Sequence, residues 1–196
     1  MSPSKKELYE TINADIYRNT GRHYKHGIIR FIFKTHSPLC FIVRLRLCRY
    51  YYQKKDKAFF AKLMFAVTKY LWKKESVKLG FEIDYRSKIG KELRLPHRGS
   101  IVVHKDVLIG DNCEIMQCVT IGSNIVKSRT DVAVIRNNVM LCAGSKIIGK
   151  VSIGDNVIIG ANSVVNKDIE SNVIAAGVTA KIVKHLDKSY AVNCDY

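Results

Sequence analysis

Residues 135–165 read IRNNVMLCAGSKIIGKVSIGDNVIIGANSVV, and an aliphatic residue returns at every sixth position of this stretch. The same spacing extends towards the N-terminus with interruptions. The whole series consists of Ile83, Ile89, Leu95, Ile109, Ile115, Ile121, Ile135, Leu141, Ile147, Ile153, Ile159 and Val165. A period of six is neither a helical nor a hairpin period.

A small or branched residue stands two places before most of these positions, and Gly, Asn or Asp often follows them. The preceding residues are Ser87, Val107, Cys113, Val119, Val139, Ser145, Val151, Val157 and Ser163. Gly and Asn tolerate the positive backbone angles of tight corners. The pattern therefore predicts short strands that stack as a solenoid, in which each unit buries its apolar face against its neighbours.

An ordinary parallel sheet with crossover helices is the alternative fold. Such a sheet needs helical connections of a dozen or more residues between its strands. The repeat region contains none, so we expect a mainly β solenoid over residues 81–184, preceded by a helical domain over residues 1–80 and followed by a tail over residues 185–196.

The formal net charge of +16 is concentrated in the first 80 residues, which carry about 18 Lys or Arg against about 5 Asp or Glu. This part has helical signals. Ser4 and Glu7 have the spacing of a capping box, and Pro38 is expected to start a helix that ends at Tyr52. A further helix is expected over residues 56–79. Its apolar face consists of Phe59, Phe60, Leu63, Ala66, Val67, Tyr70 and Leu71.

Three roles are open for these basic helices. They can pack against the solenoid or a neighbouring subunit, or dock on an anionic membrane through Arg44, Arg46, Arg49 and the tyrosines of residues 50–52. Nucleic-acid binding is the weakest alternative because no known recognition motif is present. The longest apolar run, residues 39–47, is too short and too charged to cross a bilayer.

The six cysteines lack paired spacing, and no signal peptide is evident before them. We therefore expect a reduced, cytoplasmic protein, with peripheral contact at the inner face of the membrane as an option. Cys113, Cys118 and Cys142 are expected to serve as small apolar residues of the repeat. No pair of cysteines has zinc-ligand spacing, and no metal is expected.

Three segments carry a resemblance to a known family. The repeat is disturbed at Leu-Pro-His-Arg-Gly-Ser-Ile-Val-Val, residues 95–103. Residues 117–122 read Gln-Cys-Val-Thr-Ile-Gly, and residues 143–147 read Ala-Gly-Ser-Lys-Ile. These segments resemble serine O-acetyltransferases and, most closely in pattern, their relatives that acetylate capsules and polysaccharides. The resemblance implies a left-handed parallel β-helix with three hexapeptides per coil.

The resemblance also implies direct acetyl transfer from acetyl-coenzyme A to a hydroxyl, with His97 as the general base. Imidazole suits this task because it titrates near neutral pH and can accept a proton from the attacking hydroxyl. The acceptor-site candidates are His104, Gln117 and Asp131.

The implied coenzyme site lies along the coils, in a cleft shared by two subunits of a homotrimer. Small residues at Gly122, Ala143, Gly144 and Ala161 would let the pantetheine arm approach the backbone. Lys146, Lys167, Lys181 and Lys184 are candidates for its phosphates. The segment from Ser123 to Val134, basic at Lys127 and Arg129, is expected to protrude as a loop beside the cleft.

The chain departs from serine acetyltransferases around this loop. Their second active-site histidine stands in an Asp-Arg-His-Pro segment, where this chain has Thr-Asp-Val-Ala at residues 130–133, and Pro96 replaces an aspartate. A serine carboxylate and ammonium thus lack their usual partners. We therefore expect a sugar or polysaccharide-precursor hydroxyl as the acceptor, with L-serine as the alternative and a non-enzymatic β-helix scaffold as another. A zinc-dependent carbonic anhydrase is disfavoured, because the repeat has no histidine beyond His104.

Overall fold

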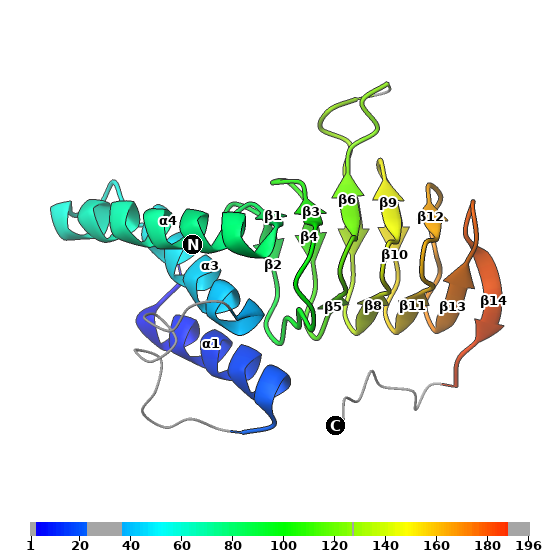
Figure 1. Cartoon of the computed structure of the whole chain (residues 1–196), viewed down its shortest axis with the longest axis horizontal. Helices are drawn as coiled ribbons and strands as arrows, with labels where there is room; N and C mark the ends of the chain where they lie inside the picture. Colours follow the sequence, from blue (N-terminus) through cyan, green and yellow to red (C-terminus); the bar gives the residue numbers. More distant parts are fainter. Residues whose placement is uncertain (1–2, 23–36, 127, 188–196) are drawn as a thin grey trace.

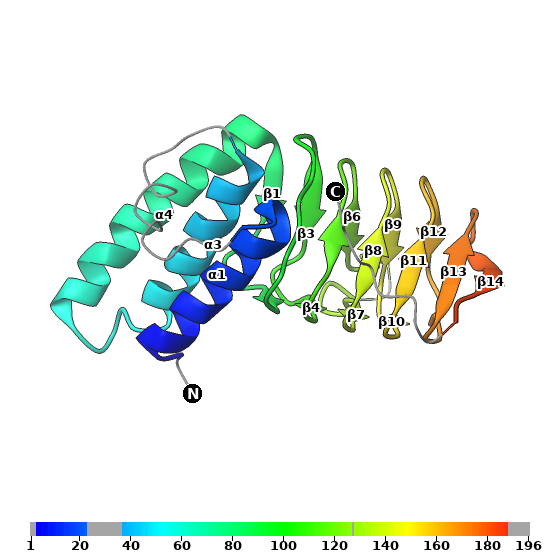
Figure 2. The same cartoon turned by 90° about the horizontal axis from the view of Figure 1, so that it is seen from below.

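The computed structural model describes residues 3–22, 37–126 and 128–187, which form a helical part and a β-solenoid joined end to end (Figures 1 and 2). The helices are α1 (Lys5–Thr20), α3 (Pro38–Tyr52) and α4 (Phe59–Leu79). The strands lie in three sheets.

Sheet 1 contains β1 (Phe81–Ile83), β3 (Ile101–Val103), β6 (Thr120–Gly122), β9 (Lys146–Ile148) and β12 (Val164–Val165). Sheet 2 contains β2 (Lys88–Ile89), β4 (Leu108–Ile109), β7 (Val134–Ile135) and β10 (Ser152–Ile153). Sheet 3 contains β5 (Glu114–Ile115), β8 (Val139–Leu141), β11 (Val157–Ile159), β13 (Val173–Ala176) and β14 (Lys181–His185).

The chain passes through sheets 1, 2 and 3 in turn and repeats this circuit, so that the five strands of sheet 1 mark five stacked coils. Neighbouring coils pair in parallel, and among the described strands only β14 returns antiparallel, next to β13. The predicted mainly β solenoid with a preceding helical region is therefore confirmed.

The six-residue series forms the core of the solenoid. All its members are buried except Ile89, which is partly buried against the same core. The small residues two places earlier, such as Val119 and Ser163, are also buried. Alternate residues of each short strand therefore point inward, and the residues between them form the outer faces of the prism.

The strand register shows where the regular coil is interrupted. Val139 pairs with Val157 and Val102 with Thr120, each eighteen residues apart, which is three hexapeptides. Phe81 pairs with Ile101, twenty residues away, and Thr120 pairs with Lys146, twenty-six residues away. The first insertion falls at the turn that contains His97. The second forms the loop of residues 123–133, which protrudes beyond β6 as expected (Figure 1).

One edge of the prism, between sheets 2 and 3, is lined by an asparagine ladder. Asn112, Asn138, Asn156 and Asn172 all have positive φ, between 53° and 62°. Each of the first three donates its side-chain amide to the side-chain oxygen of the next, at 2.9, 3.0 and 2.9 Å. Asparagine serves here both because it tolerates this backbone conformation and because its amide is donor and acceptor at once.

The helices follow the sequence signals closely. The Ser4–Glu7 capping box is present, and α3 runs from Pro38 to Tyr52 as predicted. The next helix starts three residues later than expected, at Phe59, because residues 53–57 form a turn. It ends at Leu79, and Gly80, with φ of 72°, forms a left-handed cap before β1.

Of the roles left open for the basic helices, the structure supports packing within the protein for α3, whose Arg44 and Arg46 do not form a membrane-facing surface. Arg44 and Arg46 are only 3% and 5% exposed. Arg44 pairs with Glu75 of α4 at 2.6 Å, and Arg46 pairs with Asp15 of α1 at 2.8 Å. Arg49 donates to the carbonyls of Arg86 and Ser87. Helix α3 is thus the central helix of this part. Its arginines form ion pairs and hydrogen bonds with other residues of the chain.

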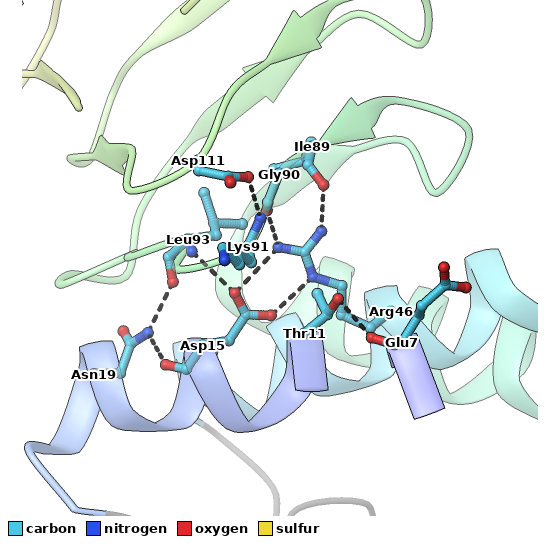
Figure 3. Close-up of polar contacts among 10 residues, drawn as sticks. All are labelled: Glu7, Thr11, Asp15, Asn19, Arg46, Ile89, Gly90, Lys91, Leu93 and Asp111. Atoms are coloured by element: carbon cyan, nitrogen blue, oxygen red, sulfur yellow. Dashed lines mark hydrogen bonds and ion pairs between the residues drawn. The ribbon is translucent and has the colours of Figure 1, made fainter. Parts of the chain in front are cut away.

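The Asp15–Arg46 pair also joins the helices to the first coil (Figure 3). Arg46 donates to the carbonyls of Ile89 and Gly90, while Asp15 accepts from the backbone N–H of Leu93 at 2.9 Å. Asn19 adds a bond to the Leu93 carbonyl at 2.8 Å. The ladder of backbone groups at the open end of the solenoid is in this way satisfied by side chains from α1 and α3.

Helix α4 carries large apolar residues on two faces: Phe65, Trp72 and Leu79 pack against the rest of the protein, and a second set lies on the outside. Its buried positions are Ala61, Thr68, Glu75, Ser76 and Leu79. The large apolar residues on the outside are Phe59, Phe60, Leu63, Val67, Tyr70 and Val77. None of the described helices combines the length and apolar character that a membrane span requires.

Candidate functional site

Several of the predicted site residues lie above one another at one edge of the prism. At this edge the chain passes from sheet 3 to sheet 1. We call it the histidine edge; it consists of residues 96–100, 117–118, 143–144 and 161–162 of successive coils. The N–H of Gly144 donates to the Gln117 carbonyl at 3.0 Å, and that of Asn162 donates to the Ala143 carbonyl at 2.9 Å. The structure therefore brings together His97, Gln117, Ala143, Gly144 and Ala161.

His97 is exposed in the extended turn at the start of this edge. Two residues later, Gly99 has φ of 131°, and a β-carbon there would lie 3.1 Å from Cβ of Gln117. The Gly99 N–H donates to the Leu79 carbonyl at the end of α4, at 3.1 Å. The turn is thus fixed against both the next coil and the helical part. Within the described ranges, no carboxylate forms an ion pair with His97.

Gln117 supplies a polar atom without a partner. Its side-chain oxygen, Oε1, is buried and accepts no hydrogen bond from any described residue, and the same holds for Oγ of Ser145 on the next coil. Buried acceptors normally find a donor.

Cys118 was expected to pack as a small apolar residue, and this is wrong: it is exposed and has φ of 63°. It occupies the corner itself, and its carbonyl accepts a hydrogen bond from the ammonium of Lys146. Cys113 is buried as expected, and burial raises the pKa of its thiol to about 12. Cys142 is partly buried, and burial raises the pKa of its thiol too.

Four of the other predicted residues lie at a second edge, where the chain passes from sheet 1 to sheet 2. This loop edge contains His104, Lys167 and the loop with Asp131, and Gly122 ends β6 beside it. The outer face of sheet 1 separates it from the histidine edge, and β3 lies between His97 and His104. Within one chain, His97 is therefore not brought next to His104 or Asp131.

His104 is held in its own turn. Its backbone N–H donates to the Ile121 carbonyl at 2.9 Å, and its Nδ1 accepts from the Asp106 N–H at 3.3 Å. In the loop, Val132 packs against the solenoid core and Ala133 is fully buried. These two residues occupy the positions at which the resemblance would place histidine and proline.

A groove of about 680 Å³ lies between α4 and sheet 1, beside His104 but away from His97. Trp72 and Lys73 line it on the helix, and Asp84 lines it at the first coil. Burial by itself raises the pKa of Asp84, but hydrogen bonds from Arg86 outweigh it and hold this pKa below its ordinary value. The groove thus carries charges of both signs.

Lys181 and Lys184 lie on exposed β14 at the far end of the solenoid. Ala161 is exposed on the histidine edge, and Gly144 has φ of 76° with Asn162 directly against it: a β-carbon on Gly144 would lie 2.0 Å from Oδ1 of Asn162. Glycine is therefore favoured at residue 144, because a side chain there would be strained and would displace the Asn162 amide. Among the described residues, no group of three or more His, Cys, Asp or Glu side chains is placed to hold a metal ion.

Sequence reasoning missed two residues of this edge, Gly99 and Asn162. Gly99 could have been found because a glycine within an inserted stretch often permits close approach of two backbones. Asn162 could have been found because it stands one coil below the corner of Gly144, at a position where an asparagine tolerates positive φ.

The family described as bacterial transferase hexapeptide, with six repeats, matches residues 133–167. The serine acetyltransferase of Staphylococcus epidermidis is 41% identical over 105 residues, which are 54% of this chain and 49% of the relative. The chain thus spans about half the length of the curated relative that it matches.

Two solved structures share the fold. A serine acetyltransferase in complex with CoA has a TM-score of 0.70 and 25% identity, over 91% of this chain and 71% of that one. A serine acetyltransferase in complex with cysteine has a TM-score of 0.73 and 26% identity, over 95% and 69% of the two chains. The chain therefore folds as a parallel β-helix with a hexapeptide-repeat segment, and it is similar to serine acetyltransferases in both sequence and fold.

Proposed function

We propose that the chain is an acetyl-coenzyme A-dependent O-acetyltransferase with His97 as its general base. The observation that carries the proposal is the histidine edge, where exposed His97 stands at one end of a column of small residues, next to the unpartnered Oε1 of Gln117. The similarity to serine acetyltransferases supports the same reaction class.

In this reaction the imidazole of His97 accepts the proton of an acceptor hydroxyl as the hydroxyl oxygen attacks the thioester carbonyl carbon. A C–O bond forms, the C–S bond breaks, and the proton passes from His97 to the leaving thiolate. Proton transfer by a positioned side chain contributes roughly a hundredfold to ten-thousandfold to the rate. His97 suits this role because its side chain is exposed on a turn that is itself fixed by Gly99.

The histidine edge also fits the pantetheine arm of coenzyme A. The edge exposes Ala161 beside Gly144, two positions that carry no bulky side chain. Lys146 reaches the same edge, because its ammonium donates a hydrogen bond to the Cys118 carbonyl.

The acceptor that the comparisons favour is L-serine, because the relatives and structures described above are named serine acetyltransferases. They give no support to a closer relationship with polysaccharide acetyltransferases.

A sugar hydroxyl is the second candidate, and one observation favours it. Val132 packs on the solenoid core at the position where a second active-site histidine would be expected. This place is therefore apolar, and it offers no partner to the carboxylate of an amino acid.

We further propose that the working site is shared between copies of the chain, as in a homotrimer. His97 and the loop with Asp131 lie on different edges of one solenoid. A cleft that contains both would need the histidine edge of one copy to face the loop edge of another.

A thiol-release assay with acetyl-coenzyme A tests the proposal. L-serine is compared with a panel of free sugars and glycan fragments, and His97→Ala is the catalytic control. Acceptor-dependent thiol release that falls in His97→Ala is expected. Turnover of serine assigns the first acceptor, and turnover of a sugar without serine assigns the second.

A scaffold role would be indicated by the absence of coenzyme A binding in calorimetry. The proposal would also be overturned by thiol release that is undiminished in His97→Ala, because the proton would then be removed elsewhere.

A further inference from the structure

Helix α4 carries large apolar residues on two faces. One set, which includes Phe65, Trp72 and Leu79, packs against the rest of the protein. The other set is exposed: Phe59 is 85% exposed, Leu63 52%, Tyr70 65% and Val77 71%. A surface helix normally buries its apolar stripe. An exposed apolar stripe of this length marks a surface that is covered by something else.

The stripe runs straight along the helix. With 3.6 residues per turn, Phe59, Leu63, Ala66, Tyr70 and Val77 fall on one line. The helix has 21 residues, so the line is about 30 Å long. This geometry suits a flat apolar partner or a second helix rather than a small ligand.

Lysines border the stripe on both sides. On the helical wheel, Lys62, Lys69 and Lys73 follow one border, and Lys74 and Lys78 follow the other. All five are exposed, and none forms an ion pair with a described residue. The one acidic residue of α4, Glu75, is buried and paired with Arg44. The outer face of α4 is therefore apolar along its centre and uniformly cationic along its borders.

Two partners could cover this face of α4: the same helix of a second copy, or an anionic surface. The distribution of charge distinguishes them. If two α4 helices met along their stripes, the lysine borders of one would face the lysine borders of the other, without acidic partners to compensate. An anionic lipid surface instead accepts the apolar stripe between its headgroups, while the lysine stems extend sideways to place their ammonium groups at the phosphates.

We propose that the outer face of α4 is a docking surface for an anionic membrane, on which the helix lies in the plane of the interface. The rest of the fold permits this, because Glu75 and Ser76 hold the inner side of α4 through bonds to Arg44 and to the Phe81 carbonyl. The helix is therefore already formed and oriented before it meets the surface, which lowers the ordering cost of binding.

Vesicle co-sedimentation of the full chain tests the proposal. The probes are vesicles of phosphatidylcholine mixed with phosphatidylglycerol, and vesicles of phosphatidylcholine alone. We expect binding to the mixed vesicles, weaker binding to the neutral ones, and a decrease with added salt. Lys69→Gln with Lys74→Gln should weaken partitioning roughly 20-fold, and Leu63→Gln with Tyr70→Gln by at least about tenfold.

Lys91→Gln with Lys150→Gln is the matched control, because it removes the same charge from exposed positions of the solenoid. It should leave partitioning nearly unchanged. All variants replace exposed side chains, and circular dichroism checks that their helix content is retained. Acceptor-independent binding of coenzyme A by each variant is measured in parallel, so that failure of docking is distinguished from failure of the proposed activity.

Three outcomes would overturn the proposal. The first is an absence of binding to either kind of vesicle. The second is binding that the control variant weakens as much as the α4 variants do, which would assign it to general charge. The third is a decrease in the mass of the soluble assembly in the Leu63→Gln, Tyr70→Gln variant without vesicle binding, which would identify a second copy of the chain as the occupant.

Discussion

The carboxylate of Asp15 and the guanidinium of Arg46 meet at 2.8 Å in a place where both side chains are at most 5% exposed. Around them, Asp15 accepts from the Leu93 N–H and Arg46 donates to the Ile89 carbonyl. This pair therefore does more than join α1 to α3. It satisfies backbone groups of the first coil, which has no preceding coil to pair with.

We expect Asp15→Asn to lower the free energy of unfolding by about 3–5 kcal/mol, because it leaves the buried charge of Arg46 without compensation. Urea denaturation followed by circular dichroism measures the effect. Glu10→Gln is the control in the same helix: its pair with Lys6 is 4.0 Å long and exposed, so its removal should cost less than about 1 kcal/mol. Equal losses in the two variants would contradict the structural role of the buried pair.

The asparagine ladder gives a second prediction. Asn156 accepts from Asn138 at 3.0 Å, donates to Asn172 at 2.9 Å, and has φ of 59°. Asn156→Ala should cost about 3 kcal/mol, from two lost hydrogen bonds and an unfavourable left-handed backbone. Asn156→Gly should lower the stability by about 1 kcal/mol less than Asn156→Ala does, because glycine adopts the left-handed backbone conformation without strain but restores neither hydrogen bond. Thermal unfolding of both variants, with exposed Asn166→Ala as control, separates the two contributions, and equal costs for Ala and Gly would contradict this division.

Much of the solenoid follows from its sequence because the six-residue period is a local property. A buried aliphatic such as Ile147 and a buried small residue such as Ser145 recur at fixed spacing, and stacking on identical neighbours leaves little freedom. The fold of the solenoid and the stacking of Gln117, Ala143 and Gly144 on one edge could therefore be predicted from the sequence. The insertion at His97 was visible as a change of two residues in the period.

The helical part was harder to predict because its burial is decided by long-range contacts. The charges of Arg44 and Arg46 suggested an exposed basic helix, yet their partners Glu75 and Asp15 are each 31 residues away in sequence. Conversely, the apolar stripe of α4 suggested a buried face and is exposed. Amphipathic periodicity shows that a helix has two faces, but it does not show which face meets the protein.

The separation of His97 from His104 and Asp131 in space also could not be predicted from the sequence. His97 and His104 are only seven residues apart, but β3 spans the width of a sheet face between them. Which edge of a prism a residue occupies depends on the exact start of each strand. Sequence-based boundaries are too imprecise to assign this for strands of two or three residues.

The cysteines allow the histidine edge to be probed chemically. Cys118 is exposed on that edge, whereas burial raises the pKa of both Cys48 and Cys113 to about 12. The thiolate is the reactive form, so at about pH 8.5 the two buried thiols should be almost unreactive while Cys118 is alkylated. In a Cys194→Ser background, which removes the cysteine outside the described residues, mass spectrometry after iodoacetamide treatment should find Cys118 labelled first.

Acetyl-coenzyme A should slow the alkylation of Cys118, because the proposed path of the pantetheine arm passes Gln117 and Gly144 on either side of it. Free adenosine is a suitable control ligand, since it lacks that arm. An unchanged labelling rate at saturating acetyl-coenzyme A would contradict the placement of the coenzyme on this edge.

The two histidines that flank β3 should differ sharply in their contribution to catalysis. His97→Ala should lower kcat by a factor on the order of a hundred or more, with little change in KM for acetyl-coenzyme A, because only proton transfer in the transition state is lost. His104→Ala should change kcat by less than about threefold, since Nδ1 of His104 is engaged by the Asp106 N–H in its own turn. Steady-state kinetics with the acceptor found in the thiol-release assay measures both effects. A large fall in kcat for His104→Ala would instead show that the loop edge of a second copy brings this ring to the reacting atoms, and the roles of the two edges would then have to be reassigned.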